Sequence, residues 1–170
     1  MSKKIKFLSI ICASSLFSAD NFVGLEYNYA DKIVENVCGC SESKSFPTIK
    51  FGQTEENYRY YLSVSPITWD SATALISNLN LDYKQDLFGF AKAYIGASIG
   101  YSYIDGDFSG SAKGFNYGLN IGISKEITKD IAIDVGYKYI NSDNLTANNG
   151  KNFFTLKDIH PITVSVNYKF

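Results

Sequence analysis

The sequence predicts an all-β protein in which eight antiparallel strands form a single up-and-down barrel. From Asn21 onward, apolar and polar residues alternate with a period of two, and no segment keeps the period of a helix. The composition agrees, because 13 Tyr and 12 Phe among 170 residues favour strands. The connections also alternate between short and long, which is typical of a meander with two different ends.

The first 19 residues, MSKKIKFLSIICASSLFSA, are expected to be a cleaved signal peptide. Three lysines precede an apolar stretch, Phe7 to Phe17, that is too short to cross a bilayer as a helix, and small residues follow it. We expect cleavage after Ala19, with a site one or two residues earlier as the alternative. Residues 20–170 then form one domain, since no linker or change of composition divides them.

Four strands are predicted in the first half of the chain, each with apolar residues at every second position. They are NFVGLEYNYA (21–30), PTIKFGQ (47–53), YRYYLSVS (58–65) and SNLNLDYK (77–84). The second has the faintest pattern, with Ile49 and Phe51 opposed to Lys50 and Gly52.

Four strands with a clearer pattern are predicted in the second half. They are AKAYIGASIGYSY (91–103), FNYGLNIGIS (115–124), IAIDVGYKY (131–139) and ITVSVNYKF (162–170). On one side they carry mainly Ile, Val, Leu and Tyr, and on the other mainly Gly, Ser, Asn and charged residues. The total of eight is an even number, as a closed meander of this class needs.

Short polar turns are predicted at one end of the barrel and long loops at the other. The turns are TEEN (54–57), KQD (84–86) and TKD (128–130). The long loops, rich in Gly, Ser and Asn, are expected at about 31–46, 65–77, 104–113 and 141–159.

A period of two fits a soluble barrel with an apolar interior as well as a membrane barrel whose apolar side faces lipid. Residue size favours the membrane barrel. The polar side carries many Gly, Ser and Asn residues, which suit the narrow interior of eight strands and would only weaken strands that face water.

The positions of the aromatic residues favour the same choice. On the apolar side they gather near the two ends of the strands, while Ile, Val, Leu and Ala lie between them. Two aromatic belts around an aliphatic band are what the two interfaces of a bilayer select. The sequence therefore predicts an eight-stranded antiparallel up-and-down transmembrane β-barrel.

The last strand ends on alternating apolar residues and a terminal aromatic, at Val164, Val166, Tyr168 and Phe170. This ending resembles the C-terminal assembly signal of bacterial outer-membrane barrels, and the chain from Asn21 on resembles the small eight-stranded barrels of the OmpA-transmembrane or OmpX type. The resemblance implies a Gram-negative outer-membrane location with both termini in the periplasm. It also implies contact with outer-membrane lipid and lipopolysaccharide, the barrel assembly machinery and periplasmic chaperones.

Charged residues on the polar side are expected to lie inside the barrel. Those predicted to form an ion-pair and hydrogen-bond network that plugs the lumen are Glu26, Lys50, Arg59, Asp82, Lys92, Asp134 and Lys138. Enclosed ions need partners, because an unpaired buried charge is strongly destabilising. The alternative is a narrow pathway that favours anions, since bases outnumber acids on this side.

Two other groups of residues suggest chemistry only weakly. Cys38 and Cys40 could form a disulfide in an exported chain, although the ring of a Cys-Gly-Cys bridge is tight, and two thiols alone make a poor metal site. A lipid A-modifying enzyme would need a Ser activated by a His, but the single His160 is followed by Pro161 and Ile162 and has no matching Ser. No catalytic residue, metal or cofactor is predicted.

The function expected from the sequence is a structural or surface-interaction role through four extracellular loops. Loops on a rigid barrel are where such proteins bind, and the target could be a host or cell-surface ligand. The near balance of 16 Lys and Arg against 17 Asp and Glu predicts no nucleic-acid binding. A monomer is expected, and a small-solute channel is the main alternative function.

Overall fold

A computed structural model describes residues 20–36, 41–69, 72–106, 110–142, 145–148, 153–156 and 158–170. The predicted signal peptide, Cys38 and Cys40 lie outside these residues, so the cleavage and the disulfide stay predictions. The described residues include no candidate transmembrane helix.

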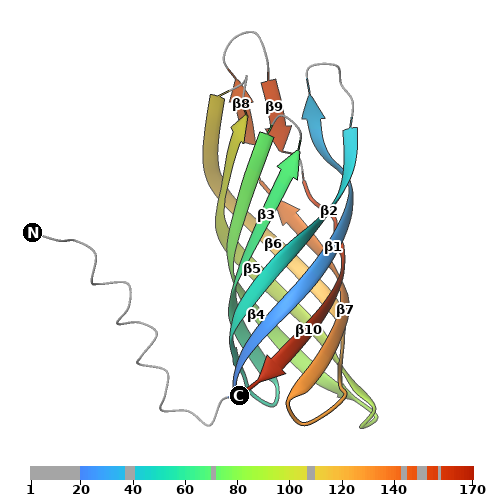
Figure 1. The fold of residues 1–170 in the computed structure, drawn as a ribbon. Helices are drawn as coiled ribbons and strands as arrows, with labels where there is room; N and C mark the ends of the chain where they lie inside the picture. Colours follow the sequence, from blue (N-terminus) through green and yellow to red (C-terminus); the bar gives the residue numbers. More distant parts are fainter. Residues whose placement is uncertain are drawn as a thin grey trace, which may run out of the picture.

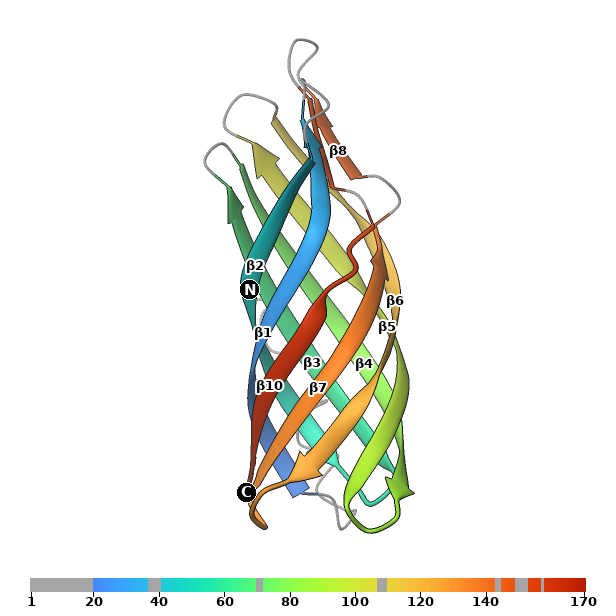
Figure 2. The same ribbon diagram turned by 90° about the vertical axis from the view of Figure 1, so that its right-hand side faces the viewer.

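The described chain is all-β and forms one closed barrel of eight antiparallel strands (Figures 1 and 2). The barrel strands are β1 (Asp20–Asn36), β2 (Ser41–Thr54), β3 (Tyr58–Trp69), β4 (Ala72–Leu87), β5 (Ala91–Gly106), β6 (Gly110–Glu126), β7 (Ile131–Asn141) and β10 (Ile162–Lys169). Neighbours in this series pair with each other, and β10 also pairs with β1 to close the barrel. The predicted fold class is confirmed.

Two short strands, β8 (Leu145–Asn148) and β9 (Phe153–Leu156), form a hairpin between β7 and β10. The hairpin adds to the sheet through pairing of β9 with Val34 to Asn36 at the end of β1. We call this end of the barrel the hairpin end. The opposite end, where the β2–β3, β4–β5 and β6–β7 turns and Phe170 lie, is the turn end (Figure 1).

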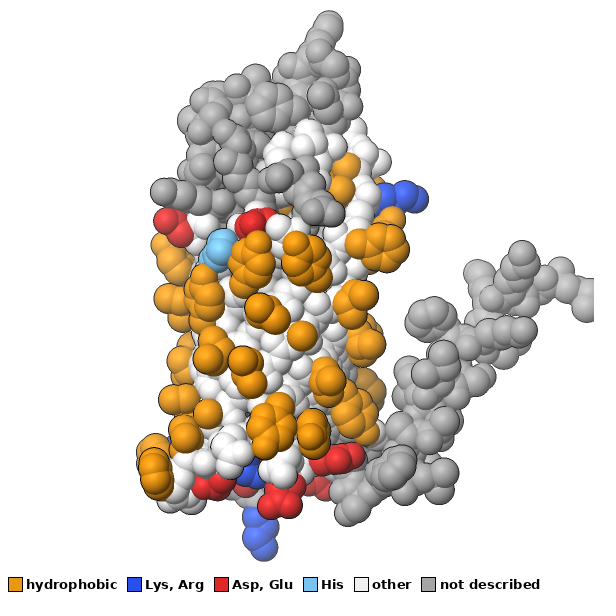
Figure 3. Space-filling view, turned by 180° about the vertical axis from the view of Figure 1, so that it is seen from behind, with side chains coloured by type: hydrophobic (Ala, Val, Ile, Leu, Met, Phe, Trp, Pro, Cys, Tyr) orange, Lys and Arg blue, Asp and Glu red, His pale blue; other side chains and the backbone are white. Residues whose placement is uncertain are grey.

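The outer face of the barrel is apolar across its middle, as Figure 3 shows for one side. Outward Leu, Ile and Val residues form the aliphatic band, and several are more than half exposed, including Leu25, Leu79, Ile99, Leu119 and Ile121. Exposed aromatic residues flank the band at both ends. Toward the hairpin end they are Tyr27, Tyr29, Tyr101, Tyr103, Phe115, Tyr117 and Tyr137, and toward the turn end Tyr58, Tyr83, Tyr168 and Phe170.

The strands are longer than the sequence pattern predicted. β1, β4, β5 and β6 have 16 or 17 residues, whereas about 9–11 tilted residues suffice to cross a bilayer. The loops predicted at about 31–46, 65–77 and 104–113 are therefore wrong, because most of these residues continue the strands. The fourth predicted loop, 141–159, contains the β8–β9 hairpin.

The physical reason is that the apolar side of several strands, β3 and β4 among them, changes near the hairpin end. In β3, Leu62 and Val64 point outward, but Ile67 and Trp69 point inward and are almost fully buried. In β4 the inward residues change from Asn78 to Ile76 and Ala74. Because the alternation is interrupted where this change occurs, the segments resemble loops in the sequence while the backbone stays extended.

These inward apolar side chains form a core inside the hairpin end of the barrel. It consists of Ala30, Phe46, Ile67, Trp69, Ala72, Ala74, Ile76, Ile104, Ile140, Leu156 and Ile159. Leu156 comes from the β8–β9 hairpin, and Leu145 and Ala112 pack against the cluster. This end of the barrel therefore has the internal packing of a soluble protein.

One turn also differs from its prediction. β4 continues through the predicted turn at 84–86 to Leu87, and the chain reverses at residues 88–90. Phe88 and Gly89 there have φ values of 57° and 72°, in the left-handed region that a tight reversal needs. The consequence is that Lys84 belongs to a strand and points into the barrel.

The barrel wall splits between β2 and β3 near the hairpin end. Their pairing runs from Thr54–Arg59 to Ile49–Val64, and the described residues beyond it show no further pair. In the same register the next outward pair would be Pro47 with Pro66. The Glu55 amide donates to the Tyr58 carbonyl across this turn, so in this register the outward pairs are the hydrogen-bonded ones. Two prolines have no N–H to donate and cannot form such a pair. The split therefore follows from two facing prolines.

Replacing both prolines in the variant Pro47→Val/Pro66→Val should extend the β2–β3 ladder by one hydrogen-bonded pair. Two added hydrogen bonds would stabilise the barrel by about 1–3 kcal/mol in unfolding. Hydrogen exchange monitored by NMR should show protected amides at both new valines. Unprotected amides at 47 and 66 would contradict the role given to the prolines, and each single variant serves as the comparison.

Candidate functional site in the barrel interior

Six of the charged residues predicted for the interior form one buried chain of alternating charge. Lys138 contacts Glu26 at 2.5 Å, and Glu26 lies 3.3 Å from Lys50. Lys50 lies 3.6 Å from Asp134, which is 2.6 Å from Arg59. Arg59 then contacts Asp82 at 2.7 Å. Three cations thus balance three carboxylates.

The chain crosses the interior because its members come from different strands. Glu26 lies on β1, Lys50 on β2, Arg59 on β3, Asp82 on β4, and Asp134 and Lys138 on β7. Each side chain has a relative exposure of 11 % or less. Since buried ions are costly without partners, the network fixes how these five strands face one another.

Polar side chains supply further hydrogen bonds to the charged groups. The Ser165 hydroxyl accepts from Lys50 at 2.7 Å. The Asn120 amide donates to Asp82 at 2.6 Å, and the Asn167 amide donates to Asp134 at 2.9 Å. The two amides thus give Asp82 and Asp134 additional donors, as buried ion pairs require.

Aromatic rings surround the Arg59 guanidinium within the same layer. Its central carbon lies 5.0 Å from the ring centre of Tyr94 and 5.3 Å from that of Tyr61. The Tyr94 hydroxyl lies over Gly122 and Gly136, which face each other on β6 and β7. A Cβ at either glycine would overlap this hydroxyl, so close approach explains both residues.

The interior is filled from this network to the hairpin end. Next to the network lies a layer of Asn and Ser side chains, including Ser63, Asn78 and Asn80, around a cavity of only about 10 Å³. The apolar core follows, with Leu156 and Ile159 fully buried. A polar layer and an apolar layer therefore stand in series inside the barrel.

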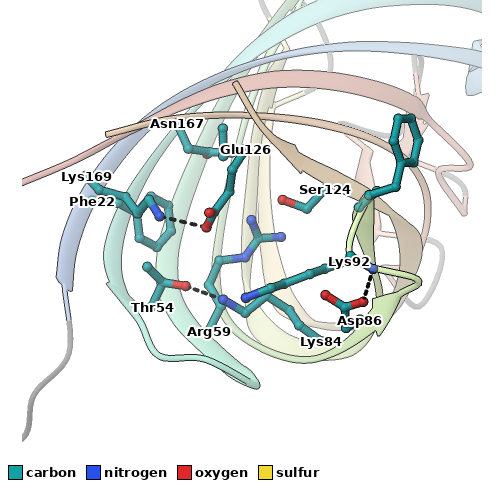
Figure 4. A pocket seen from close by; sticks show the side chains of 14 residues that line it. Phe22, Thr54, Arg59, Lys84, Asp86, Lys92, Ser124, Glu126, Asn167 and Lys169 are labelled. Carbon is teal, nitrogen blue, oxygen red and sulfur yellow. Dashed lines mark hydrogen bonds and ion pairs between the residues drawn. The ribbon is translucent and has the colours of Figure 1, made fainter. Parts of the chain in front are cut away.

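A larger cavity of about 300 Å³ lies at the turn end, on the other side of Arg59. Figure 4 shows Arg59, Lys84, Lys92 and Lys169 among its lining side chains, with Asp86 and Glu126. Lys92 was predicted to join the network, but the structure places it here. It donates to the Glu56 carbonyl at 3.4 Å and is only partly buried.

Lys84 is a residue of this cavity that the sequence prediction missed. It donates to the Thr54 hydroxyl at 2.5 Å and to the Glu55 carbonyl at 2.6 Å. It follows Tyr83 of the turn-end aromatic belt and thus lies beyond the aliphatic band. Burial, followed by the positive charges of Arg59, Lys92 and Lys169, lowers the pKa of Lys84 to about 8. The sequence signal for its inward position was the alternation of β4, in which Asn80, Asp82 and Lys84 occupy every second place.

His160 lies on the outside of the barrel in a group of polar aromatic contacts. Its Nδ1 is 2.8 Å from the Tyr137 hydroxyl, while the Tyr139 hydroxyl donates to Asp158 at 2.9 Å. Among the described residues, no serine contacts His160. The outward position two residues after it is occupied by Ile162. The described residues also contain no cluster of three or more His, Cys, Asp or Glu side chains suited to a metal.

The residues of the predicted assembly signal lie on the outer face of β10. Val164, Val166, Tyr168 and Phe170 are all about half exposed or more. β10 pairs with β1 on one side and β7 on the other, and the Phe170 amide donates to the Asn21 carbonyl at 2.9 Å. The terminal strand is thus the last element needed to close the barrel.

Solved structures share this fold. Neisserial surface protein A is 18% identical, with 88% of this chain and 97% of that chain covered and a TM-score of 0.72. OprH from Pseudomonas aeruginosa is 24% identical, with 89% and 100% covered and a TM-score of 0.60. Ail, the attachment invasion locus protein of Yersinia pestis, is 11% identical, with 91% and 100% covered and a TM-score of 0.55.

Comparison by sequence gives no comparable match. No protein-family model matches the chain, and no curated protein matches it either. The structural likenesses establish that the chain has the fold of the small eight-stranded outer-membrane β-barrels. Fold alone does not assign a role, which has to come from the residues of this chain.

The variant Asp134→Asn tests how strongly the interior network holds the barrel. It would leave Arg59 and Lys50 each with one carboxylate fewer, so the free energy of unfolding in lipid vesicles should fall by about 3–5 kcal/mol in urea titrations. Asp105→Asn, at an exposed position of β5, is the matched control and should change it by less than about 0.5 kcal/mol. Equal stability of the two variants would contradict the network.

Proposed function

We propose that this protein is an outer-membrane barrel with a sealed interior that acts through its surface at the hairpin end. The observation that carries the proposal is the filled interior. The ion-pair network, the Asn and Ser layer and the apolar core occupy the barrel one after another. A rigid, closed barrel leaves its exposed end as the part that can meet other molecules.

The proposed orientation places the hairpin end outside the cell and the turn end in the periplasm. The start of β1 at Asp20 and the end of the chain at Phe170 both lie at the turn end. Outer-membrane barrels keep their short turns in the periplasm and their longer connections outside. The exposed aliphatic band between two aromatic belts supports the membrane location.

The hairpin end offers several features suited to binding. The β8–β9 hairpin extends the sheet beyond the barrel. At Pro47 and Pro66 the pairing between β2 and β3 stops, so the ends of these two strands are not joined to each other. Two proteins of this fold carry names that refer to a surface or to attachment. We propose lipopolysaccharide and a host or cell-surface ligand as the partner classes, with the barrel as a monomer.

Assembly through the general outer-membrane pathway is part of the same proposal. The outward row of Val164, Val166, Tyr168 and Phe170 would be recognised by the barrel assembly machinery after transport by periplasmic chaperones. A non-enzymatic role is proposed because His160 contacts two tyrosines and no nucleophile among the described residues.

The channel alternative is tested by conductance of the purified barrel in planar bilayers. Because the interior layers are packed, we expect no stable conductance steps in 1 M KCl. The double variant Ile104→Gly/Ile140→Gly, which thins the apolar core, should still conduct poorly because the ion-pair network remains. Large, stable steps from the unchanged protein would contradict a sealed interior.

The surface role is tested by binding of cells or glycans to the barrel displayed on bacteria. A hairpin-end variant with Asp105→Asn, Ser111→Ala and Lys113→Ala should lose at least half of the binding, because these exposed residues lie on the proposed contact face. A turn-end variant with Lys129→Ala and Asp130→Asn is the matched control and should keep it. Equal binding by both variants would contradict the proposal.

A further inference from the structure

The cavity at the turn end contains more positive charge than its carboxylates neutralise. Arg59 is already bound to Asp82 and Asp134, and Lys169 contacts Glu126 at 2.8 Å. Lys84 and Lys92 remain, and none of the described carboxylates lies within ion-pair distance of either. They donate hydrogen bonds to neutral oxygens of Thr54, Glu55 and Glu56.

These two ammonium groups converge on one place from neighbouring strands. Lys84 on β4 reaches the Glu55 carbonyl, and Lys92 on β5 reaches the next carbonyl, of Glu56. Figure 4 shows both side chains inside the cavity beside Arg59. Because each lysine keeps donor capacity beyond these contacts, both can turn toward a common acceptor.

The other charged groups at this end leave that acceptor position open. On β4, the Asp86 carboxylate accepts from the Gly89 amide at 2.5 Å. On β6 and β10, Glu126 and Lys169 bind each other at the rim. The carboxylates of Glu55 and Glu56 belong to exposed residues of the β2–β3 turn. The cavity floor is Arg59, whose charge is already balanced by Asp82 and Asp134, so the surplus positive charge belongs to Lys84 and Lys92.

We propose that the turn-end cavity binds a phosphate group, held between Lys84 and Lys92 above Arg59. A volume of about 300 Å³ is roughly ten times the share of one water molecule, so it admits a phosphate with a small organic substituent. Charge-assisted hydrogen bonds from two ammonium groups suit a dianion. The site is independent of the hairpin-end surface proposed above.

The pKa of Lys84 supports this assignment. Its value of about 8 lies below the usual range because burial and the neighbouring cations disfavour the charged form. A bound dianion would stabilise that charged form and raise the pKa. By linkage, phosphate binding should be strongest below pH 8 and should weaken as the pH rises through it. The remaining charge of the site would be set by Lys92, Lys169, Asp86 and Glu126.

The phosphate could come from a free periplasmic phosphate ester or from a lipid headgroup at the membrane edge. Both present phosphate oxygens to the two lysines, although a free monoester carries up to two negative charges and the diester of a lipid headgroup carries one. The sources differ in that a headgroup stays attached to an acyl chain and a free ester reaches the cavity from solution. The experiment therefore needs one arm for each source.

The first arm adds inorganic phosphate and glycerol phosphate to the full barrel in a phosphate-free sugar detergent, with 31P NMR and calorimetry as readouts. The second uses phosphatidylglycerol bicelles and follows the headgroup phosphorus signal. The variants are Lys84→Met and Lys92→Met, and Lys129→Met, at an exposed position of the β6–β7 turn outside the cavity, is the matched control. Unchanged heat-modifiable gel migration shows that each variant is folded.

We expect saturable phosphate binding in at least one arm, weakened about tenfold or more by Lys84→Met and by Lys92→Met and unchanged in Lys129→Met. The arm that shows it identifies the source. Binding should also fall between pH 7 and pH 9. The proposal is overturned if neither arm shows binding, if all three variants bind equally, or if chloride at the same ionic strength competes as well as phosphate.

Discussion

The pairing of β10 with β1 is the interaction on which the rest of this structure depends. Eight consecutive residue pairs, from Phe22–Lys169 to Tyr29–Ile162, turn an open sheet into a cylinder. In hydrocarbon, an open edge would leave backbone N–H and C=O groups without partners, so only a closed barrel is stable there. Closure also turns one side of every strand into an enclosed space that eight strands make narrow.

Enclosure explains the chemistry of the interior. Charged side chains that cannot reach water must find each other, and the alternating series from Lys138 to Asp82 does this without excess charge. Where the barrel extends past the aromatic belt, the outer face meets water and the inner face packs as an apolar core. The two sides thus exchange character near the hairpin end, while the strands continue.

The sequence was sufficient for the fold class and for the positions of most interior charges. Glu26, Lys50, Arg59, Asp82, Asp134 and Lys138 could be predicted because they alternate with clearly apolar neighbours. The contacts among them could not, because they depend on strand register around a closed barrel. The strand extensions were missed because Ile67, Trp69 and Ile76 reverse the expected pattern. Lys84 was missed because its segment, KQD, resembles a turn.

The two ends of the barrel consequently differ in what they offer to other molecules. The hairpin end is packed and extended, with the β8–β9 hairpin and a split between β2 and β3, whose ends pair only with β1 and β4. The turn end is hollow and positively charged around Lys84 and Lys92. Between them lie the ion-pair network, the Asn and Ser layer and the apolar core of the described residues.

The most direct test of this account is spin-label accessibility on the outer face, in a background with Cys38 and Cys40 replaced by Ser. Labels at Leu79, Ile99 and Ile121 should be accessible to oxygen and shielded from a nickel chelate, as in lipid. Labels at Thr73, Asp105 and Ser111 should show the reverse, as in water. Contact with lipid at all six positions, or with water at all six, would contradict the exchange of character at the aromatic belt.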